Sequence, residues 1–233
     1  MIVYIVRHGH CYGNVRGYMN GPRVHGIDTP LTKLGRRQAG RLNRHLVANW
    51  NLDVDAGWFH RDYVFDRIIS SPMRRALETT ILMRGRMKTP IEIRTEVCER
   101  DGLTFVDSSG KKSSDTGLKR PEIERMAEHI TIPEDITDDG WWDGRIEPHS
   151  DCVQRAFVFA TYLDELRIQD GKNLCVVTHG GFGDYLIRHL LRSGEDNQFG
   201  LANTGVTSIA LDGENEGRRL HYHNRTKHLR DAT

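Results

Sequence analysis

The sequence predicts an α/β fold, a three-layer αβα sandwich with a mostly parallel central sheet and an inserted cap region. Short apolar runs rich in β-branched residues alternate along the chain with segments of helical periodicity. Uninterrupted apolar runs are typical of strands that are covered on both faces, and their alternation with helices is typical of βαβ units. The length of 233 residues fits one domain, 1–233, with an elaborated loop.

Four apolar runs predict the strands of this sheet. They lie at residues 2–6, 67–70, 174–178 and 207–211. Each run is apolar on both alternating faces, which a parallel sheet between two layers of helices requires.

Four segments with apolar residues at helical spacing predict the helices. They cover about residues 31–46, 73–84, 150–166 and 183–192. Thr32 can cap the first helix, because a threonine side chain accepts a hydrogen bond from a backbone N–H of the first turn. Pro72 suits the first turn of the second helix, and Ser150 or Asp151 can open the third.

The stretch from about residue 100 to residue 148 departs from this alternation. It contains a polar segment at 108–115 and an acidic run that ends in Trp141 and Trp142. Long connections in compact domains are usually functional loops or lids, so we expect a cap over the site here. We expect the two tryptophans to pack the cap onto the body; stacking on a substrate ring is the alternative. The polar residues 213–233 predict a hairpin edge and a tail.

Composition excludes several classes of protein. With 33 basic and 32 acidic residues the net charge is +1, so we expect no nucleic-acid partner and no anionic membrane surface. No apolar run approaches the roughly 20 residues of a membrane helix, and the apolar start meets Arg7 without a signal-peptide pattern. Four scattered cysteines indicate free thiols in a reducing cytosol. We expect a cytoplasmic protein, and a homo-oligomer is left open.

Histidine and arginine follow three of the predicted strands. Arg7 and His8 come directly after the first, Arg74 and Arg75 follow the second, and His179 follows the third. In an open α/β sheet, the loops beyond the carboxyl ends of the strands form the ligand crevice. We therefore expect two imidazoles and up to three guanidiniums at one edge of the sheet.

Glycine accompanies both histidines. Gly9 follows His8, and Gly180 with Gly181 follows His179. Glycine lets the backbone approach a ligand closely and offer its N–H groups to an anion. Together with the arginines, these residues predict a cradle for phosphate.

The run from Arg7 to Asn14 resembles the Arg-His-Gly signature of the histidine phosphatase superfamily, in its phosphoglycerate mutase-like branch. Further blocks similar to those of the family follow in the family's order, at 28–39, 70–80, 97–100, 179–181 and 203–204. The resemblance spans roughly residues 2 to 211, and the ordered series is more specific than a single Arg-His-Gly.

The resemblance implies a role for each matching residue. His8 is the nucleophile and becomes phosphohistidine, while Arg7, Arg75 and His179 hold the phosphoryl oxygens. Asn14 adds a hydrogen bond there. Nearby arginine charges lower the pKa of an imidazole and so favour the neutral ring that can attack.

Glu99 is the implied proton donor to the leaving oxygen, after which it assists the attack of water. Gly102 follows Glu99 more closely than the family's glycine usually does. Cys11 stands where threonine or serine is common and is a substrate-binding candidate; a small buried filler is the alternative. Lys111, Lys112 and Lys119 could meet a second substrate phosphate or form a solvated face.

The same chemistry predicts neither a metal nor another cofactor. Two guanidiniums and a second imidazole can stabilise the charge that develops on the phosphoryl oxygens. His221 and His223 alternate on a predicted strand, but no third metal ligand stands at suitable spacing, so we interpret them as surface histidines.

The leading hypothesis is therefore a phosphatase that hydrolyses a small phosphorylated metabolite through phosphohistidine, without a metal. The first alternative is a mutase that moves phosphate between hydroxyls of a phosphoglycerate. Here only Lys119-Arg120-Pro121 resembles the basic, proline-rich insert of such mutases. The second alternative is a non-catalytic module that binds a phospho-ligand or a protein on the same fold.

Overall fold

One mixed sheet forms the centre of the protein. In the computed structural model, which describes residues 1–18, 24–48, 65–211 and 217–230, seven strands pair in the order β6-β3-β2-β7-β1-β8-β9. The first five strands in this order are parallel, whereas β8 runs antiparallel to β1 and β9 antiparallel to β8. The strands are β1 Ile2–Arg7, β2 Arg67–Ser70, β3 Ile91–Ile93, β6 Ile130–Thr131, β7 Leu174–Thr178, β8 Val206–Leu211 and β9 Arg218–Arg225.

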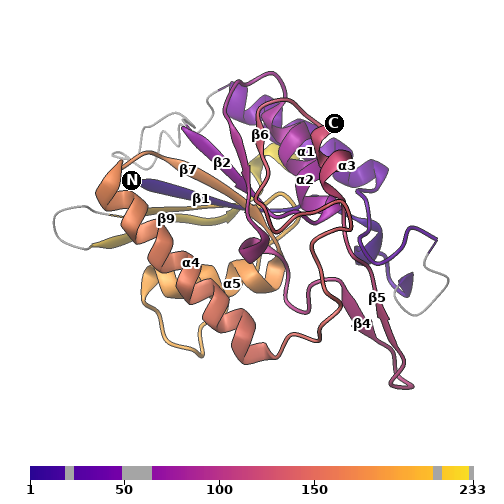
Figure 1. The fold of residues 1–233 in the computed structure, drawn as a ribbon. Coiled ribbons are helices and arrows are strands. Elements are labelled where there is room, and N and C mark those ends of the chain that lie inside the picture. Colours follow the sequence, from indigo (N-terminus) through magenta and orange to yellow (C-terminus); the bar gives the residue numbers. More distant parts are fainter. Residues whose placement is uncertain (19–23, 49–64, 212–216, 231–233) are drawn as a thin grey trace.

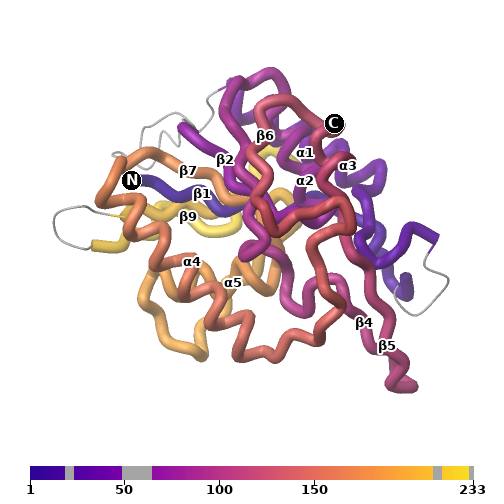
Figure 2. The backbone as a smooth tube through the Cα atoms, viewed as in Figure 1, coloured from indigo at the N-terminus to yellow at the C-terminus, as the bar shows by residue number. Residues whose placement is uncertain are grey.

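Helices cover both faces of this sheet, which confirms the three-layer α/β prediction. Helices α1 and α2 lie on one side and α4 and α5 on the other (Figure 1). The helices are α1 Lys33–Val47, α2 Arg74–Arg84, α3 Arg120–Glu124, α4 His149–Gln169 and α5 Gly180–Leu191, with 3-10 turns η1 Tyr12–Asn14, η4 Thr95–Val97 and η5 Lys227–Leu229. The chain path brings β9, near the C-terminus, into the same half of the sheet as β1 (Figure 2).

Alternate residues of each central strand enter different cores. In β1, Val3 and Ile5 join the core under α4 and α5, whereas Tyr4 and Val6 join the core under α1 and α2. All four side chains are buried. Because both faces are covered, the strand is apolar from Ile2 to Val6, as the sequence predicts for this layer arrangement.

The mostly parallel sheet that the sequence predicts has two antiparallel strands. The apolar run 207–211 forms β8, which pairs antiparallel with β1, and β9 pairs antiparallel with β8. An apolar run reports burial on both faces and carries no information about direction. Strands β3 and β6 have three and two residues, too short to show a period, and the sequence did not predict them.

The starts of three helices differ from the predicted ones. Helix α2 begins at Arg74, so Pro72 lies before its first turn. Helix α4 begins at His149, and neither Ser150 nor Asp151 caps it. Helix α5 begins at Gly180, three positions before the predicted start at 183, so Gly180 and Gly181 lie in its first turn.

The inserted region forms a hairpin that projects from the body (Figure 1). Its strands are β4 Thr104–Val106 and β5 Lys112–Ser114. Trp142 fixes its base: the ring is 4% exposed, its Nε1–H donates to Thr104 Oγ1 at 2.9 Å, and it packs beside Met73. This confirms the packing interpretation of Trp142. Later in the same stretch β6 joins the main sheet, so residues 100–148 are not wholly separate from it.

The remaining sequence expectations have mixed outcomes. The predicted hairpin edge is confirmed at β9, whereas 212–216 and 231–233 lie outside the described residues. All four cysteines are buried free thiols. Within the described ranges, no group of three or more metal-ligating side chains is placed to hold an ion. No helix in the part of the chain that the structure describes is long and apolar enough to cross a membrane.

The first turn of α1 touches the loop that follows β1. Thr32 Oγ1 accepts a hydrogen bond from the N–H of Gly35 at 3.2 Å, which confirms the predicted cap. A Cβ atom on Gly35 would lie 2.0 Å from the carbonyl oxygen of His10, and one on Gly9 would lie 2.8 Å from the Gly35 oxygen. Both glycines are needed because two backbone segments meet here without side chains between them.

This contact predicts opposite effects for two glycines of the same helix. Gly35→Ala should lower the free energy of unfolding by about 1–3 kcal/mol, because its methyl group meets rigid backbone. Gly40→Ala should raise it by about 0.5–1 kcal/mol, since no atom lies within 4 Å of the new Cβ and alanine favours the helix. Urea unfolding of the two variants measures both; equal effects would contradict the contact.

Candidate active site

Two histidines leave adjacent strands at the same edge of the sheet. Strands β1 and β7 pair in parallel with Arg7 opposite Thr178, and the N–H of His8 donates to the Thr178 carbonyl oxygen at 2.9 Å. His8 and His179, the next residues along, therefore start at the same height. Their ring centroids lie 5.1 Å apart, and the two residues are 2% and 0% exposed. Both rings can contact one small tetrahedral anion.

The backbone fixes the tautomer of His8. Its Nδ1 lies 2.8 Å from the carbonyl oxygen of Gly9. A carbonyl oxygen only accepts, so Nδ1 must carry the proton. In the neutral ring, the lone pair then lies on Nε2. His8 is thereby prepared as a nucleophile or a base through Nε2.

A serine orients the second imidazole. His179 Nε2 lies 2.8 Å from Ser71 Oγ, which itself accepts a hydrogen bond from the N–H of Met73 at 3.2 Å. Ser71 Oγ accepts from Met73, so its own proton can be donated to His179 Nε2. Nε2 is then the acceptor of the neutral ring, and Nδ1 carries the ring proton. His179 Nδ1 is buried and has no hydrogen-bond partner among the described residues. It is then a donor available to an anion.

Burial and two arginines keep both imidazoles neutral. Burial lowers the pKa of His8 well below its usual 6.5, and the charges of Arg75 and then Arg7 lower it further. The pKa of His179 is lowered by burial and, next, by Arg75. A neutral ring is the form in which an imidazole attacks. The sequence analysis predicts that arginine charges lower the pKa of His8, and Arg75 and Arg7 act in this direction.

The two arginines whose charges act on the histidines belong to different elements. Arg7 ends β1, and its Nη1–H donates to the carbonyl oxygen of Leu201 at 2.6 Å. Arg75 lies half-buried in the first turn of α2, where its backbone oxygen accepts from Thr79 Oγ1 at 2.6 Å. Guanidinium groups bind phosphate oxygens through paired hydrogen bonds, so this edge of the sheet is suited to a phosphoryl group.

The Glu99 side chain lies against the N-terminus of α5, the helix that follows His179. Its Oε1 accepts from the backbone N–H of Phe182 at 3.0 Å and of Arg100 at 2.9 Å, and its Oε2 accepts from the N–H of Gly181 at 3.2 Å. A helix N-terminus offers free N–H groups to a carboxylate. The Gly181 N–H therefore holds Glu99 here, rather than standing open to an anion as expected.

Two further contacts hold the segment that carries Glu99. Thr178 Oγ1 donates to the carbonyl oxygen of Val97 at 2.7 Å, and Arg155 Nη1 donates to that of Cys98 at 3.0 Å. Arg155 also forms an ion pair with the buried Glu147 at 2.8 Å. The acid is thus tied to β7 on one side and to α4 on the other.

The predicted binding residues around His8 contact one another. Asn14 Oδ1 accepts from the N–H of Cys11 at 3.1 Å and from its thiol at 3.4 Å. Cys11 is buried, so it supports Asn14 in this structure. The Gly9 N–H donates to Thr79 Oγ1 at 2.9 Å instead of standing open. The Gly180 backbone lies against the Arg7 guanidinium. Contact of these residues with a substrate stays a prediction.

Three polar residues that position the site were not identified as such from the sequence. Besides Ser71 and Thr79, Asn203 Nδ2 donates to the backbone oxygen of His8 at 2.9 Å and to Asn14 Oδ1 at 3.3 Å. All three lie inside the blocks that resemble the family. Their hydroxyl or amide groups were the available signal, but their partners become evident only when distant segments are brought together.

Comparison with known proteins gives a consistent result. Residues 3–226 match the family model of the histidine phosphatase superfamily, branch 1. An adenosylcobalamin/alpha-ribazole phosphatase of Salmonella typhi is 28% identical over 194 residues, which cover 82% of this chain and 80% of that protein.

Solved structures show the same fold. Bacillus stearothermophilus YhfR superposes with a TM-score of 0.63 at 24% identity, covering 98% of both chains. The alpha-ribazole phosphatase of Shigella flexneri gives 0.62 at 19% identity, covering 97% of both chains. A mutant phosphoserine phosphatase of Entamoeba histolytica in complex with phosphoserine gives 0.58 at 19% identity, covering 98% of both.

The lowered pKa of His8 predicts a pH-dependent stability. The unfolded chain binds a proton at His8 below about pH 6.5, whereas the folded protein does not until a lower pH. Between these values the free energy of unfolding should fall as the pH falls. His8→Asn should reduce that slope, by at most about 1.4 kcal/mol per pH unit.

Urea unfolding between pH 5.5 and 7 measures this slope. His129→Asn is the matched control, since His129 is exposed and its ring stays in water in both states. The carboxyl groups contribute equally to the slope in the parent and in both variants, so their contribution cancels when each variant is compared with the parent. An unchanged slope in His8→Asn would show that His8 is not held neutral.

Proposed function

The chain belongs to branch 1 of the histidine phosphatase superfamily, and from this premise we propose that it hydrolyses phosphate monoesters of small metabolites through a phosphohistidine at His8. The observation that carries the proposal is the pair of imidazoles, 5.1 Å apart and flanked by Arg7 and Arg75. One ring has its Nε2 lone pair free for attack, and the other offers a proton from Nδ1. A binding site alone would not need a nucleophile with a fixed tautomer.

The first step forms the phosphoenzyme. The lone pair of His8 Nε2 attacks phosphorus while the bond from phosphorus to the alcohol oxygen breaks. Arg7, Arg75 and His179 Nδ1–H stabilise the charge on the equatorial oxygens, where it is greatest in a loose transition state. Glu99, entering the step protonated, gives its proton to the departing alkoxide. The products are a phosphohistidine, a free alcohol and the Glu99 carboxylate.

The second step returns the enzyme to its starting state. A water molecule attacks phosphorus as the N–P bond breaks, and the electron pair of that bond returns to His8 Nε2. The Glu99 carboxylate takes a proton from the water and is again an acid. Throughout both steps the proton stays on Nδ1 and remains hydrogen-bonded to the Gly9 oxygen, so the ring does not turn.

The range of relatives supports a small phosphorylated metabolite as substrate. One relative by sequence is an adenosylcobalamin/alpha-ribazole phosphatase, and one structural relative is a phosphoserine phosphatase. The two guanidiniums and His179 supply the charge stabilisation that a metal supplies in other phosphoryl-transfer enzymes. We therefore include metal independence in the proposal.

The first test traps the phosphoenzyme. In EDTA, the purified protein should release phosphate from p-nitrophenyl phosphate, and enzyme quenched with alkali should retain an alkali-stable, acid-labile phosphoryl group at residue 8. His8→Asn should lose at least about 10⁴-fold in kcat, because the nucleophile is removed. His129→Asn, an exposed histidine, is the control and should keep the parent's rate.

Two outcomes would contradict the proposal. If the parent hydrolyses no activated ester and His8→Asn changes nothing, the chain is a binding module. If isomerisation of 3-phosphoglycerate is much faster than release of phosphate, it is a mutase. Mass spectrometry of the labelled peptide separates attachment at His8 from attachment elsewhere.

The second test concerns the proton donor. Glu99→Gln cannot protonate a leaving alkoxide, so hydrolysis of alkyl phosphates should slow by about 10²–10⁴-fold. Hydrolysis of p-nitrophenyl phosphate should slow much less, because nitrophenolate leaves without a proton. Comparing the two esters in one variant cancels any general loss from the altered contacts of Glu99 with α5.

Glu96→Gln is the matched control for this test. Its carboxylate lies three residues earlier, pairs with Arg94 and is 39% exposed. It should slow neither ester. Equal slowing of both esters by Glu99→Gln would reject Glu99 as the acid.

A further inference from the structure

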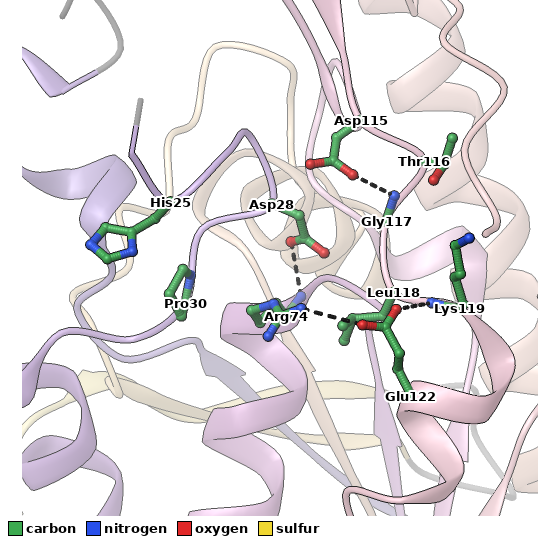
Figure 3. Close-up of a pocket in the computed structure, with 10 residues that line it drawn as sticks. All are labelled: His25, Asp28, Pro30, Arg74, Asp115, Thr116, Gly117, Leu118, Lys119 and Glu122. Atoms are coloured by element: carbon green, nitrogen blue, oxygen red, sulfur yellow. Dashed lines mark hydrogen bonds and ion pairs between the residues drawn. The ribbon is translucent and has the colours of Figure 1, made fainter. Parts of the chain in front are cut away.

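A pocket of about 390 Å³ opens beside the first turn of α2. The loop before α1 contributes Asp28, α2 contributes Arg74, and the inserted region contributes Asp115 and Lys119 from the other side (Figure 3). Its volume falls within the roughly 300–1,000 Å³ that small-molecule sites occupy. Three segments far apart in the sequence therefore enclose a space that fits a small organic group.

Asp28 faces this pocket with an unused oxygen. Asp28 is 6% exposed, and its Oδ1 accepts from the N–H of Arg74 at 2.9 Å. Its Oδ2 is buried and has no hydrogen-bond partner among the described residues. In Figure 3 the carboxyl group lies at the wall of the pocket, across from Leu118. Buried polar atoms are rarely left without a partner, so this oxygen indicates a missing donor.

The other carboxyl groups around the pocket, and the Arg74 guanidinium, already have partners. Asp115 Oδ1 accepts from the N–H of Gly117 at 3.0 Å. Glu122 accepts from the backbone N–H of Lys119 at 2.9 Å and pairs with the Arg74 guanidinium at 3.9 Å. The lining includes three carboxyl groups against one lysine and one arginine. This balance disfavours a second phosphate and favours a group that donates hydrogen bonds.

Arg75 connects the pocket to the reaction centre. It follows Arg74 in α2, and its charge lowers the pKa of His8 while it opposes the rise in the pKa of Asp28. Burial nevertheless raises the pKa of Asp28 to about 7. Because Arg74 lines the pocket, Arg75 is one residue from the pocket lining in the first turn of α2. A phosphate held by Arg75 against His8 can thus extend its alcohol part toward Asp28.

We propose that this pocket binds the alcohol part of the substrate and selects alcohols with a hydroxyl or ammonium group that donates a hydrogen bond to Asp28 Oδ2. The inference rests on the proposed phosphatase function and adds the class of substrate. Sugar, polyol and amino-alcohol monophosphates fit this class, whereas bisphosphates and plain alkyl phosphates do not.

The test compares esters of matched shape. Glucose 6-phosphate carries hydroxyls, glucosamine 6-phosphate adds an ammonium group, and cyclohexylmethyl phosphate has the same ring size without a donor. The parent enzyme should show kcat/KM for at least one sugar ester about tenfold or more above that of the cyclohexyl ester, because the unpaired carboxyl oxygen penalises the latter. Equal values for all three esters would overturn the inference.

Asp28→Asn identifies the residue responsible. The amide can still accept from the Arg74 N–H through its oxygen, but it presents an NH₂ group to the pocket. An ammonium group cannot accept from that NH₂, whereas a hydroxyl can. The quantity compared is kcat/KM of each sugar ester divided by kcat/KM of the cyclohexyl ester. If ammonium is the recognised group, this ratio should fall about tenfold for glucosamine 6-phosphate. If a hydroxyl is the recognised group, the ratio for glucose 6-phosphate should fall by less. Unchanged ratios would remove Asp28 from the proposal.

Two controls separate the possible failures. Asp138→Asn changes an exposed carboxylate outside the pocket and should leave all ratios as in the parent. Calorimetric affinities of the same three esters for His8→Asn report the pocket without turnover. If His8→Asn binds the three esters with the expected selectivity but the parent enzyme hydrolyses none of them, the phosphatase function is rejected and the pocket's selectivity stands. If the parent enzyme hydrolyses all three esters equally well, the phosphatase function stands and the pocket's selectivity is rejected.

Discussion

The parallel pairing of β1 with β7 is the constraint on which the site depends. With Arg7 opposite Thr178 and the His8 N–H bonded to the Thr178 oxygen, the two histidines must emerge side by side. A shift of either strand by one residue would turn one imidazole to the other face of the sheet. The apolar packing on both faces resists such a shift, because Val3 and Tyr4 would exchange cores. The core of the protein thus sets the distance between its two reactive rings.

Hydrogen bonds at this edge of the sheet fix the orientation of the two imidazole rings and of the segment that carries Glu99. Gly9 and Ser71 select the tautomers of the two rings, and Thr178 joins β7 to the segment before Glu99. These contacts use backbone atoms and short hydroxyl side chains, which lose little conformational entropy when they are ordered. A site built in this way is largely preorganised before a ligand arrives, which is the condition for electrostatic stabilisation of a phosphoryl transition state.

The sequence predicted those parts of the molecule that local pattern determines. The central strands and four main helices follow from apolar spacing, and Thr32 caps α1 as its position indicates. The antiparallel direction of β8 and the two-residue β6 could not be predicted, since neither leaves a local pattern. The two histidines could be placed at one edge because each directly follows a predicted strand of a mostly parallel sheet. The unused oxygen of Asp28 could not, because its environment comes from residues about 90 positions away.

The proposed function and the pocket at Asp28 together give the site two halves of opposite hydrogen-bonding character. Around His8, the groups of Arg7, Arg75 and His179 are donors, which suits a phosphoryl group that only accepts. Beside Asp28, carboxyl groups predominate, which suits an alcohol that donates. A phosphomonoester fits in one orientation, because reversal would place its anionic end against carboxylates and leave the guanidiniums without an anion. Such repulsion against the wrong arrangement contributes to specificity as directly as attraction to the right one. On this argument, the charge pattern of the site delivers the phosphorus atom to His8 and the alcohol to the inserted region.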